Sequence, residues 1–199
     1  MSHYFTDNSN LEENRKDHSF RFSGHLFTFT TDTGVFSKRG VDAGSEILLE
    51  ALEKEDLNGK VLDLGCGYGV LGIVLKKINP DIQITLIDIN PRAVELTTIN
   101  CQNNQVEGTV YESNGFEKID DTYQTIITNP PIRTGKKEIF KLYSDAYAHL
   151  EDGGTFYVVI RKQQGAESTK AYLEELFGNC DILCKSKGYW VLKSHKNSN

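Results

Sequence analysis

From residue 60 onward, short runs of β-branched residues alternate with stretches in which apolar residues recur at helical spacing. This alternation is typical of a parallel sheet that is covered by helices on both faces. Residues 180–185 and 189–193 flank Lys187-Gly188, a turn signal that predicts a terminal hairpin. The expected strands before it are residues 61–64, 82–87, 109–112, 124–128 and 155–160, and the expected helices are residues 71–77, 91–103, 136–150 and 166–177.

Before residue 60 the apolar pattern changes to a period of two. Residues 20–22 and 26–30 alternate in this way around Ser23-Gly24, which predicts a β-hairpin. The apolar spacing of residues 41–52 predicts a helix that covers the edge of the sheet. We expect one α/β domain at residues 41–199, with an N-terminal extension at residues 1–40 whose hairpin packs on it.

Composition adds several exclusions. A chain of 199 residues with 38% hydrophobic and 25% charged residues has the make-up of one ordinary globular domain. No run approaches the roughly 18 apolar residues that a membrane span needs, and the start of the chain lacks the basic and apolar regions of a signal peptide. We therefore expect a cytoplasmic protein without a membrane partner. Because no CxxC pair occurs, we expect buried thiols and no metal site. The cysteines are Cys66, Cys101, Cys180 and Cys184.

The net charge of −6 argues against a protein that coats nucleic acid without specificity, because such binding draws on many Lys and Arg side chains. It leaves room for a local basic surface. Taken singly, each basic cluster is most simply interpreted as a solvated face. The clusters are Lys38-Arg39, then Arg133, Lys136, Lys137 and Lys141, and near the end Lys185, Lys187, Lys193 and Lys196.

The turn after the first sheet strand carries the strongest local signal. Residues 63–72 read Asp-Leu-Gly-Cys-Gly-Tyr-Gly-Val-Leu-Gly and lead into a helix. Gly65, Gly67 and Gly69 remove three β-carbons, so a ligand can lie against the backbone beside free N–H groups. A dinucleotide fingerprint would place a small residue where Val70 stands. The spacing instead favours a ligand that carries an amino acid and a nucleoside without a pyrophosphate.

Asp88 ends the second sheet strand, 23 residues after Gly65. A carboxylate there can accept two hydrogen bonds from a ribose diol. NAD and S-adenosylmethionine both carry such a diol, so Asp88 is consistent with either, and only the glycine spacing discriminates. The simpler alternative is a structural turn followed by an exposed carboxylate.

A second motif, Asn129-Pro130-Pro131, stands where the fourth strand ends, on the same carboxyl edge of the sheet as Gly65 and Asp88. A residue that precedes proline is driven into an extended conformation, so this loop is stiff. It can point the Asn129 side-chain oxygen and the Pro130 carbonyl the same way, as two acceptors for a planar amino group. The alternative is a rigid loop that only ends a strand.

Together, residues 61–69, Ile87-Asp88 and Asn129-Pro130-Pro131 resemble class I S-adenosylmethionine-dependent methyltransferases that act on exocyclic or amide nitrogen. Residues 34–45 and 129–136 resemble the methyltransferase small domain family, whose characterised members include ribosomal RNA guanine-N2 methyltransferases. The similarity runs from about Phe20 to Lys193. It implies S-adenosyl-L-methionine as the cofactor. It also implies a Rossmann-like fold: a mostly parallel seven-stranded sheet with helices on both faces, a C-terminal antiparallel hairpin and a short N-terminal hairpin.

The resemblance also implies residue roles. Asp63, Gly65 and Gly67 would line the methionine part of the cofactor, and Asp88 would bind the ribose. Asn114 would lie near the adenine, at a position where the family usually has Asp, and its amide oxygen can still accept from the adenine amino group. Asp42 would close over the cofactor from the other side. The full set implied to bind the cofactor is Asp42, Asp63, Gly65, Cys66, Gly67, Asp88, Ile89, Asn114 and Asn129.

The second motif limits the range of possible substrates. Ile132 stands where adenine-N6 and glutamine methyltransferases carry an aromatic residue, so the balance favours the N2 of a guanine in ribosomal RNA, either free or in a ribosomal subunit. Asn129, Pro130 and Pro131 would form the catalytic motif, with two acceptors that grip the amino N–H bonds. Basic residues would hold RNA phosphates: Arg133, Lys136 and Lys137 beside the motif, and Arg21, Lys38 and Arg39 in the N-terminal cover.

Two other functions stay open. A protein methyltransferase could act on a glutamine amide, which offers an equivalent NH2 group, although such enzymes usually have an aromatic after the two prolines and a helical N-terminal domain. A non-catalytic RNA-binding or assembly module could also retain the cofactor fold, because fold alone does not settle activity.

Overall fold

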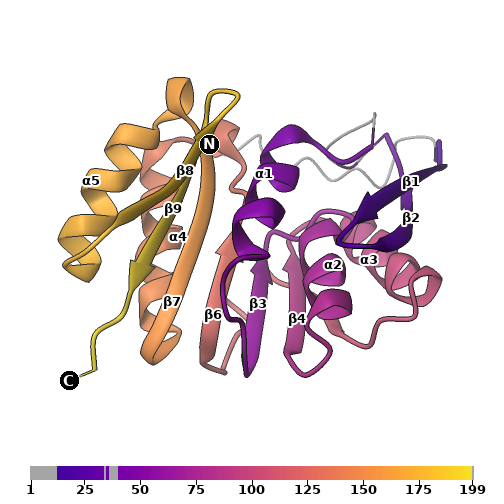
Figure 1. Ribbon diagram of the computed structural model, residues 1–199, viewed down its shortest axis with the longest axis horizontal. Coiled ribbons are helices and arrows are strands. Elements are labelled where there is room, and N and C mark those ends of the chain that lie inside the picture. The colour runs from indigo at the N-terminus through magenta and orange to yellow at the C-terminus, as the bar shows by residue number, and fades with distance from the viewer. Residues whose placement is uncertain (1–12, 34, 36–39, 199) are drawn as a thin grey trace.

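Seven strands form one mixed sheet in the computed structural model, which describes residues 13–33, 35 and 40–198 (Figure 1). The strand order is β5-β4-β3-β6-β7-β9-β8, with β9 antiparallel to both of its neighbours and the other pairs parallel. This confirms the predicted fold class. The strands are β3 (Lys60–Leu64), β4 (Gln83–Asp88), β5 (Thr109–Glu112), β6 (Tyr123–Thr128), β7 (Leu150–Arg161), β8 (Asp181–Ser186) and β9 (Tyr189–His195).

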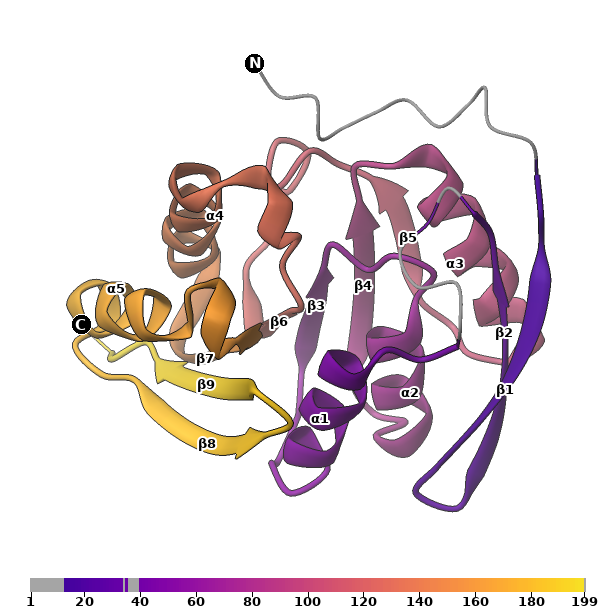
Figure 2. The ribbon, with the colours of Figure 1, turned by 90° about the horizontal axis from the view of Figure 1, so that it is seen from above.

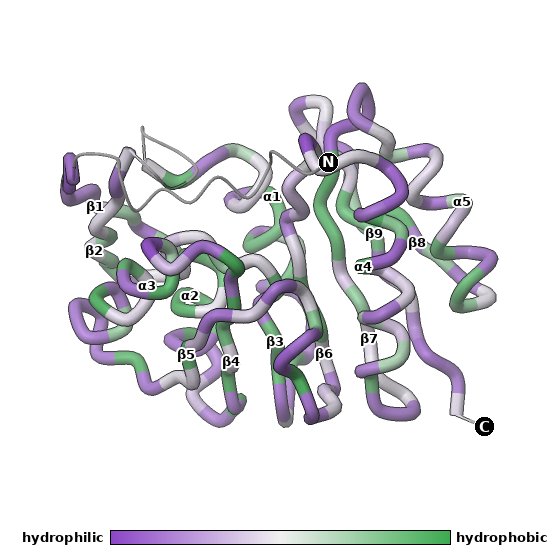
Figure 3. Tube along the Cα trace, turned by 180° about the vertical axis from the view of Figure 1, so that it is seen from behind, coloured by the Kyte–Doolittle hydropathy of each residue, from purple (hydrophilic) through white to green (hydrophobic). Residues whose placement is uncertain are grey.

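Helices cover both faces of the sheet, as Figure 2 shows from above. Because side chains alternate along a strand, β7 directs Phe156 and Val158 to one core and Tyr157 and Val159 to the other. In Figure 3 the strands in the middle of the sheet carry hydrophobic stretches, as do parts of the helices that cover it. The first face carries α1 (Ala43–Leu52), α2 (Val70–Ile78) and α3 (Pro91–Asn103), and the second carries α4 (Lys136–Ala148) and α5 (Ala166–Phe177).

Both predicted hairpins are present. In the N-terminal one, β1 (Lys16–Phe22) pairs with β2 (His25–Thr31) across Ser23 and Gly24, whose φ angles are 48° and 77°. Lys187 and Gly188, between β8 and β9, have φ angles of 49° and 80°. Two successive positive φ angles match the twist of the flanking strands, and glycine at the second position limits the steric cost.

The N-terminal hairpin is held by side chains of α3. The Asn100 side chain accepts from Thr30 N at 2.7 Å and donates to Thr30 O at 3.0 Å. One helical turn later, the Asn104 side chain makes the same two bonds to Thr28, both at 2.9 Å. Each amide thus pairs with the edge of β2 as a neighbouring strand would. Phe27 and Phe29 of β2 are 1% exposed and join the core.

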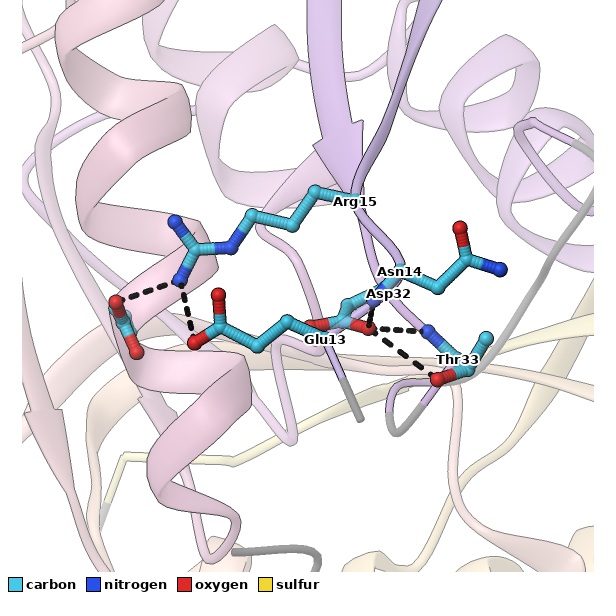
Figure 4. A network of polar contacts seen from close by, with 6 residues as sticks. Glu13, Asn14, Arg15, Asp32 and Thr33 are labelled. Carbon is cyan, nitrogen blue, oxygen red and sulfur yellow. Dashed lines mark hydrogen bonds and ion pairs between the residues drawn. The ribbon is translucent and has the colours of Figure 1, made fainter. Parts of the chain in front are cut away.

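The start of the hairpin has its own polar anchors (Figure 4). Arg15 reaches α3 through an ion pair between its Nη2 and Glu95 Oε1 at 2.6 Å. Asp32 Oδ1 accepts from Asn14 N at 2.9 Å and from Thr33 N at 2.7 Å. These bonds tie the chain before β1 to the chain after β2.

Strand β1 is longer than the predicted residues 20–22, and α4 ends two residues before the predicted residue 150. Two further elements differ in their placement. The segment Asp152-Gly153-Gly154 does not precede β7 but lies within it, because Leu150 already pairs with Tyr123 and the register then shifts. Gly153 N and Gly154 O bond to Lys196 of the C-terminal segment, both at 2.8 Å, so the glycines form an irregularity inside the strand. Helix α1 packs on the face of the sheet, over β7 and β9, and not at its edge.

No helix within the described ranges has the length and apolar character to cross a membrane. Among the same residues, no group of three or more His, Cys, Asp or Glu side chains is arranged to hold a metal ion. Cys66, Cys101 and Cys180 are buried, Cys184 is half-buried, and all have free thiols.

Candidate cofactor and acceptor site

Parallel pairing brings three distant motifs to one edge of the sheet. At the carboxyl end of β3, Leu64 pairs with Ile87 of β4 on one side and with Thr128 of β6 on the other. The residues that follow these strands are therefore neighbours. Thr128 strengthens this alignment, because its buried hydroxyl donates to Leu64 O at 2.8 Å.

The three glycines of the turn after β3 have different roles. A β-carbon built on Gly65 or Gly67 would meet no atom within 4 Å, and their φ angles are 73° and 59°. At Gly69, which caps α2, it would lie 2.8 Å from Ile73 Cδ1 and 3.0 Å from Thr97 Cγ2. Gly69 is thus required for packing. Gly65 and Gly67 instead leave a bare stretch of backbone beside open space.

Asp63 lies beneath this turn and is 0% exposed. Its Oδ2 accepts from Gly72 N at 2.9 Å, whereas Oδ1 has no hydrogen-bond partner among the described residues. The pKa of Asp63 is raised to about 7, chiefly by burial; the hydrogen bond from Gly72 opposes this shift, and the nearby Asp88 carboxylate adds to it. A buried carboxylate oxygen without a partner suits a ligand that brings a cationic donor, such as an ammonium group.

Asp88 ends β4 directly beside the glycine turn. Its Oδ2 accepts from Gly67 N and its Oδ1 from Asn90 N, both at 2.9 Å. Burial raises the pKa of this carboxyl group, and these backbone bonds oppose the shift. The other side of the turn is fixed by Thr97 of α3, whose hydroxyl donates to Gly67 O at 2.9 Å and lies 3.4 Å from Cys66 Sγ. Cys66 is buried, and its pKa is raised by that burial.

Asn129 follows β6 and meets the start of α1. Its Nδ2 donates to Asp42 Oδ2 at 3.1 Å and to Ser45 Oγ at 3.2 Å. Asp42 is also the N-cap of α1, since the same Oδ2 accepts from Ser45 N at 3.1 Å. These two bonds use the amide nitrogen, so the side-chain oxygen of Asn129 is directed elsewhere. Pro130 is buried, and Pro131 O accepts from the Thr134 hydroxyl at 2.9 Å.

The charges of the site favour a cationic ligand. Asp63 and Asp88 flank the bare backbone, and Asp42 adds a third carboxylate at the start of α1. A pyrophosphate placed here would face like charges, which is unfavourable in a partly buried site. The residues present therefore fit a nucleoside that carries positive charge better than they fit a dinucleotide.

The remaining predicted site residues that the structure describes form no hydrogen bond with the glycine turn or with Asn129. Asn114 is exposed and its Nδ2 donates to Glu117 Oε1 at 3.3 Å, while the preceding Ser113 N bonds to Asp88 O at 3.0 Å. Ile89 is half-buried between Asp88 and the start of α3. The exposed basic residues after the second motif are Arg133, Lys136 and Lys137. Arg21, also exposed, pairs with Leu26 next to the hairpin turn. Lys38 and Arg39 lie outside the described residues.

Several residues that shape the site were not assigned from the sequence. Gly72 donates to Asp63, and a β-carbon there would lie 2.5 Å from Leu86 Cδ2, so only glycine lets α2 approach the sheet this closely. Asn100 donates to Tyr68 O at 2.8 Å and so links the N-terminal hairpin to the glycine turn. Ser45 and Thr97 had no distinguishing signal. Gly72 had one, because it ends the glycine-rich segment.

The fold and this site define a class I methyltransferase, the class whose cofactor is S-adenosylmethionine. The methyltransferase small domain family model matches residues 26–193. This chain belongs to that family, which confirms the resemblance and the cofactor expected from the sequence.

The similar proteins include two kinds. The uncharacterised Bacillus subtilis protein YbxB is 41% identical over 197 residues, which are 98% of each chain. The ribosomal RNA small subunit methyltransferase C of Vibrio cholerae is 35% identical over 193 residues, covering 94% of this chain and 54% of its own length. This chain thus spans about half the length of that relative.

A solved methyltransferase structure also matches this chain. The T. thermophilus 16S rRNA guanine-N2 methyltransferase, in complex with AdoMet and guanosine, matches with a TM-score of 0.84 and 29% identity. The match covers 94% of this chain and 52% of the other. At 19% identity, a Pyrococcus furiosus methyltransferase with a TM-score of 0.68 shows the shared fold alone.

A side chain on the bare backbone should block the cofactor. We expect Gly65→Ala to lose most of its affinity for S-adenosylmethionine in isothermal titration, because the methyl group occupies the open space. Gly178→Ala is the matched control, since Gly178 also has a positive φ angle, 81°, and open space around it, but caps α5. Both variants should lose about 1 kcal/mol of stability from the left-handed backbone. If the two variants bound S-adenosylmethionine equally well, the cofactor would not lie against the backbone at Gly65.

The raised pKa of Asp63 should appear in the pH dependence of stability. Below about pH 4 the group is protonated in both states; from there to about pH 7 the folded protein without cofactor holds a proton that the unfolded chain has released, so stability falls as pH rises. Asp63→Asn removes this loss. Urea unfolding at pH 5 and pH 8 should therefore show the variant gaining on the wild type, by a few kcal/mol at most.

Asp121→Asn is the control for this titration, because its exposed carboxylate has a pKa that the Lys60 ammonium lowers. Its difference from the wild type should be constant between pH 5 and pH 8. If Asp63→Asn behaved in the same way, folding would not raise the pKa of Asp63.

Proposed function

We propose that this chain transfers a methyl group from S-adenosylmethionine to the exocyclic N2 of a guanine in ribosomal RNA. The observation that carries the proposal is Asn129 at the carboxyl edge of the sheet, beside the bare backbone of Gly65 and Gly67, with its amide nitrogen bound to Asp42 and Ser45. An amide oxygen so directed is an acceptor for a substrate amino group. The relatives that methylate ribosomal RNA support this choice of substrate.

The proposed cofactor residues would contact different parts of S-adenosylmethionine. Asp63 Oδ1 would pair with the ammonium of the methionine part, and the backbone at Gly65, Cys66 and Gly67 would line that part. Asp88 would exchange its backbone bonds for the ribose diol, next to Ile89. The Asn114 oxygen would accept from the adenine amino group after its side chain leaves Glu117. Bound in this site, the cofactor would supply an electrophilic methyl carbon on a positively charged sulfur.

Asn129 and Pro130 would prepare the nucleophile. The lone pair of a guanine amino group is delocalised into the ring, so the nitrogen attacks poorly. Two acceptors, Asn129 Oδ1 and Pro130 O, would hold its N–H bonds and favour the pyramidal geometry of the transition state. Positioning of this kind can remove on the order of 7–11 kcal/mol from a barrier. The proton would leave to water after transfer.

Methyl-labelled cofactor tests the function directly. The full chain would be incubated with transcribed small-subunit ribosomal RNA, with subunits reconstituted from that RNA, and with ribosomal protein alone. We expect label in RNA, recovered as N2-methylguanosine after nuclease digestion. Label in protein glutamine would favour the amide methyltransferase, and no label would favour a non-catalytic module.

Asn129→Ala should separate chemistry from cofactor binding. Its affinity for S-adenosylmethionine should stay near the wild-type value, because the contacts proposed for the cofactor lie mainly on β3 and β4. Turnover should fall about 100- to 1,000-fold, the range for removal of one group aimed at a transition state. Near wild-type turnover would dismiss the acceptor role.

The basic residues after the second motif should serve RNA and not the cofactor. We expect the double variant Lys136→Glu/Lys137→Glu to bind transcribed ribosomal RNA at least about tenfold more weakly, because both lysines are exposed and can neutralise phosphates. Cofactor affinity should be unchanged. The matched control Lys136→Arg/Lys137→Arg keeps both charges and should bind normally. Unchanged RNA affinity in the Glu variant would exclude this surface.

A further inference from the structure

The amide of Asn129 lies in a built environment that determines which of its two ends faces the substrate. Only the oxygen can accept from an amino group; the NH2 end would repel its hydrogens. Asp42 Oδ2 lies 3.1 Å from the other end of the amide. A carboxylate oxygen can only accept, so the atom that faces Asp42 is the nitrogen. Chemistry thus fixes the orientation.

Ser45 completes the arrangement. The two hydrogens of Asn129 Nδ2 have two acceptors, Asp42 Oδ2 and Ser45 Oγ at 3.2 Å. Ser45 is only 3% exposed, so water competes little for this bond. A flipped amide would lose its bond to Asp42 and place its oxygen against that carboxylate, and the Ser45 hydroxyl would have to turn to donate. The flipped form is therefore strongly disfavoured.

The start of α1 packs closely against Asn129 and β9. A β-carbon on Gly44 would lie 2.9 Å from Tyr189 Cε1 of β9 and 3.4 Å from Asn129 Nδ2. Thr128 ties the end of β6 to β3 through Leu64 O. Gly44 thus lets the start of α1 lie close to both β9 and Asn129, and the sheet fixes the residue that precedes Asn129.

We propose that Asp42 and Ser45 are positioning residues that fix the Asn129 amide so that its oxygen faces the substrate amino group. The inference rests on the proposed function. It gives Asp42 a different role from the cofactor contact that family resemblance implies. The negative charge of Asp42 also polarises the amide, since hydrogen bonds in a chain strengthen one another, and makes the Asn129 oxygen a better acceptor.

Exchange of the two side chains tests this role. Asn129→Asp alone places two carboxylates in contact and should lower kcat strongly. Adding Asp42→Asn lets the new amide at position 42 donate to the new carboxylate at position 129, whose second oxygen can face the substrate. We expect the double variant to recover at least about tenfold in kcat over Asn129→Asp. Asn is also a good N-cap, so α1 keeps its cap in this variant.

Asp42→Ala and Asp42→Asn provide the comparison with a cofactor contact. We expect Asp42→Ala to lower kcat roughly tenfold to a hundredfold, the effect typical of groups that orient a site's ligands. Its cofactor dissociation constant and RNA KM should change little. Asp42→Asn retains an acceptor oxygen but loses the negative charge, so its kcat should fall less than that of Asp42→Ala. A cofactor affinity that falls as much as kcat in Asp42→Ala, or no recovery in the double variant, would overturn the proposal.

A readout without RNA separates this inference from the proposed function. The side-chain amide signals of Asn129 can be assigned in a nitrogen-15 spectrum of the full chain by their loss in Asn129→Asp. Asp42→Ala should shift them and speed their exchange with water, and Asp42→Asn should change both less. If the wild type transferred no label to RNA but these signals behaved as expected, the substrate would be wrong and the orientation right. Unshifted signals in Asp42→Ala would refute the orientation itself.

Discussion

The in-register parallel pairing of β3 with β4 and β6 is the constraint on which the site depends. Leu64 lies between Ile87 and Thr128, so the chain leaves three strands at the same height. The glycine turn, the Asp88 carboxylate and Asn129 are brought together only by this pairing. A shift of one residue in either pair would turn the side chains at that strand end to the opposite face of the sheet. The apolar alternation of the two cores, which specifies the register, therefore also specifies the site.

The site contains a buried carboxylate whose ionisation is unfavourable, and a cationic ligand would stabilise its charged form. Asp63 is buried with one oxygen unpaired among the described residues, and the Asp88 carboxylate lies close enough to disfavour its ionisation further. A ligand with an ammonium and a sulfonium group would neutralise this charge. The same arrangement would resist a pyrophosphate, which gives a physical reason for the glycine spacing that the sequence displays. The buried Asp63 carboxylate therefore lowers the stability of the folded protein and also favours the binding of a cationic ligand.

Elements that depend on local chemistry could be predicted from the sequence. Helix α3 begins at Pro91 after the Asn90 cap, as expected, and both two-residue hairpin turns lie where Ser23-Gly24 and Lys187-Gly188 placed them. The start of β7 could not be predicted in this way, because Asp152-Gly153-Gly154 carries a turn signal that long-range pairing with Lys196 overrides. The position of α1 on the sheet face likewise depends on packing and not on its own pattern.

The candidate site shows the same division. Motif spacing predicted that Gly65, Asp88 and Asn129 share the carboxyl edge of the sheet, and the strand pairing agrees. It could not show that Asp42 contacts Asn129, since 87 positions separate them along the chain. Nor could it show that Asn100 acts as an edge partner for β2, because a polar residue on a helix usually points to solvent. Such contacts form when packing excludes water, because the buried polar groups must then form hydrogen bonds with one another.

A crystal structure of the chain with bound S-adenosylmethionine would test the central claim most directly. We expect the methionine ammonium to lie within hydrogen-bonding distance of Asp63 Oδ1, above the backbone at residues 65–67. The methyl group should face the side of the site toward which the Asn129 oxygen points. A cofactor bound away from this backbone, or an Asn129 amide turned so that its oxygen meets Asp42, would contradict this claim.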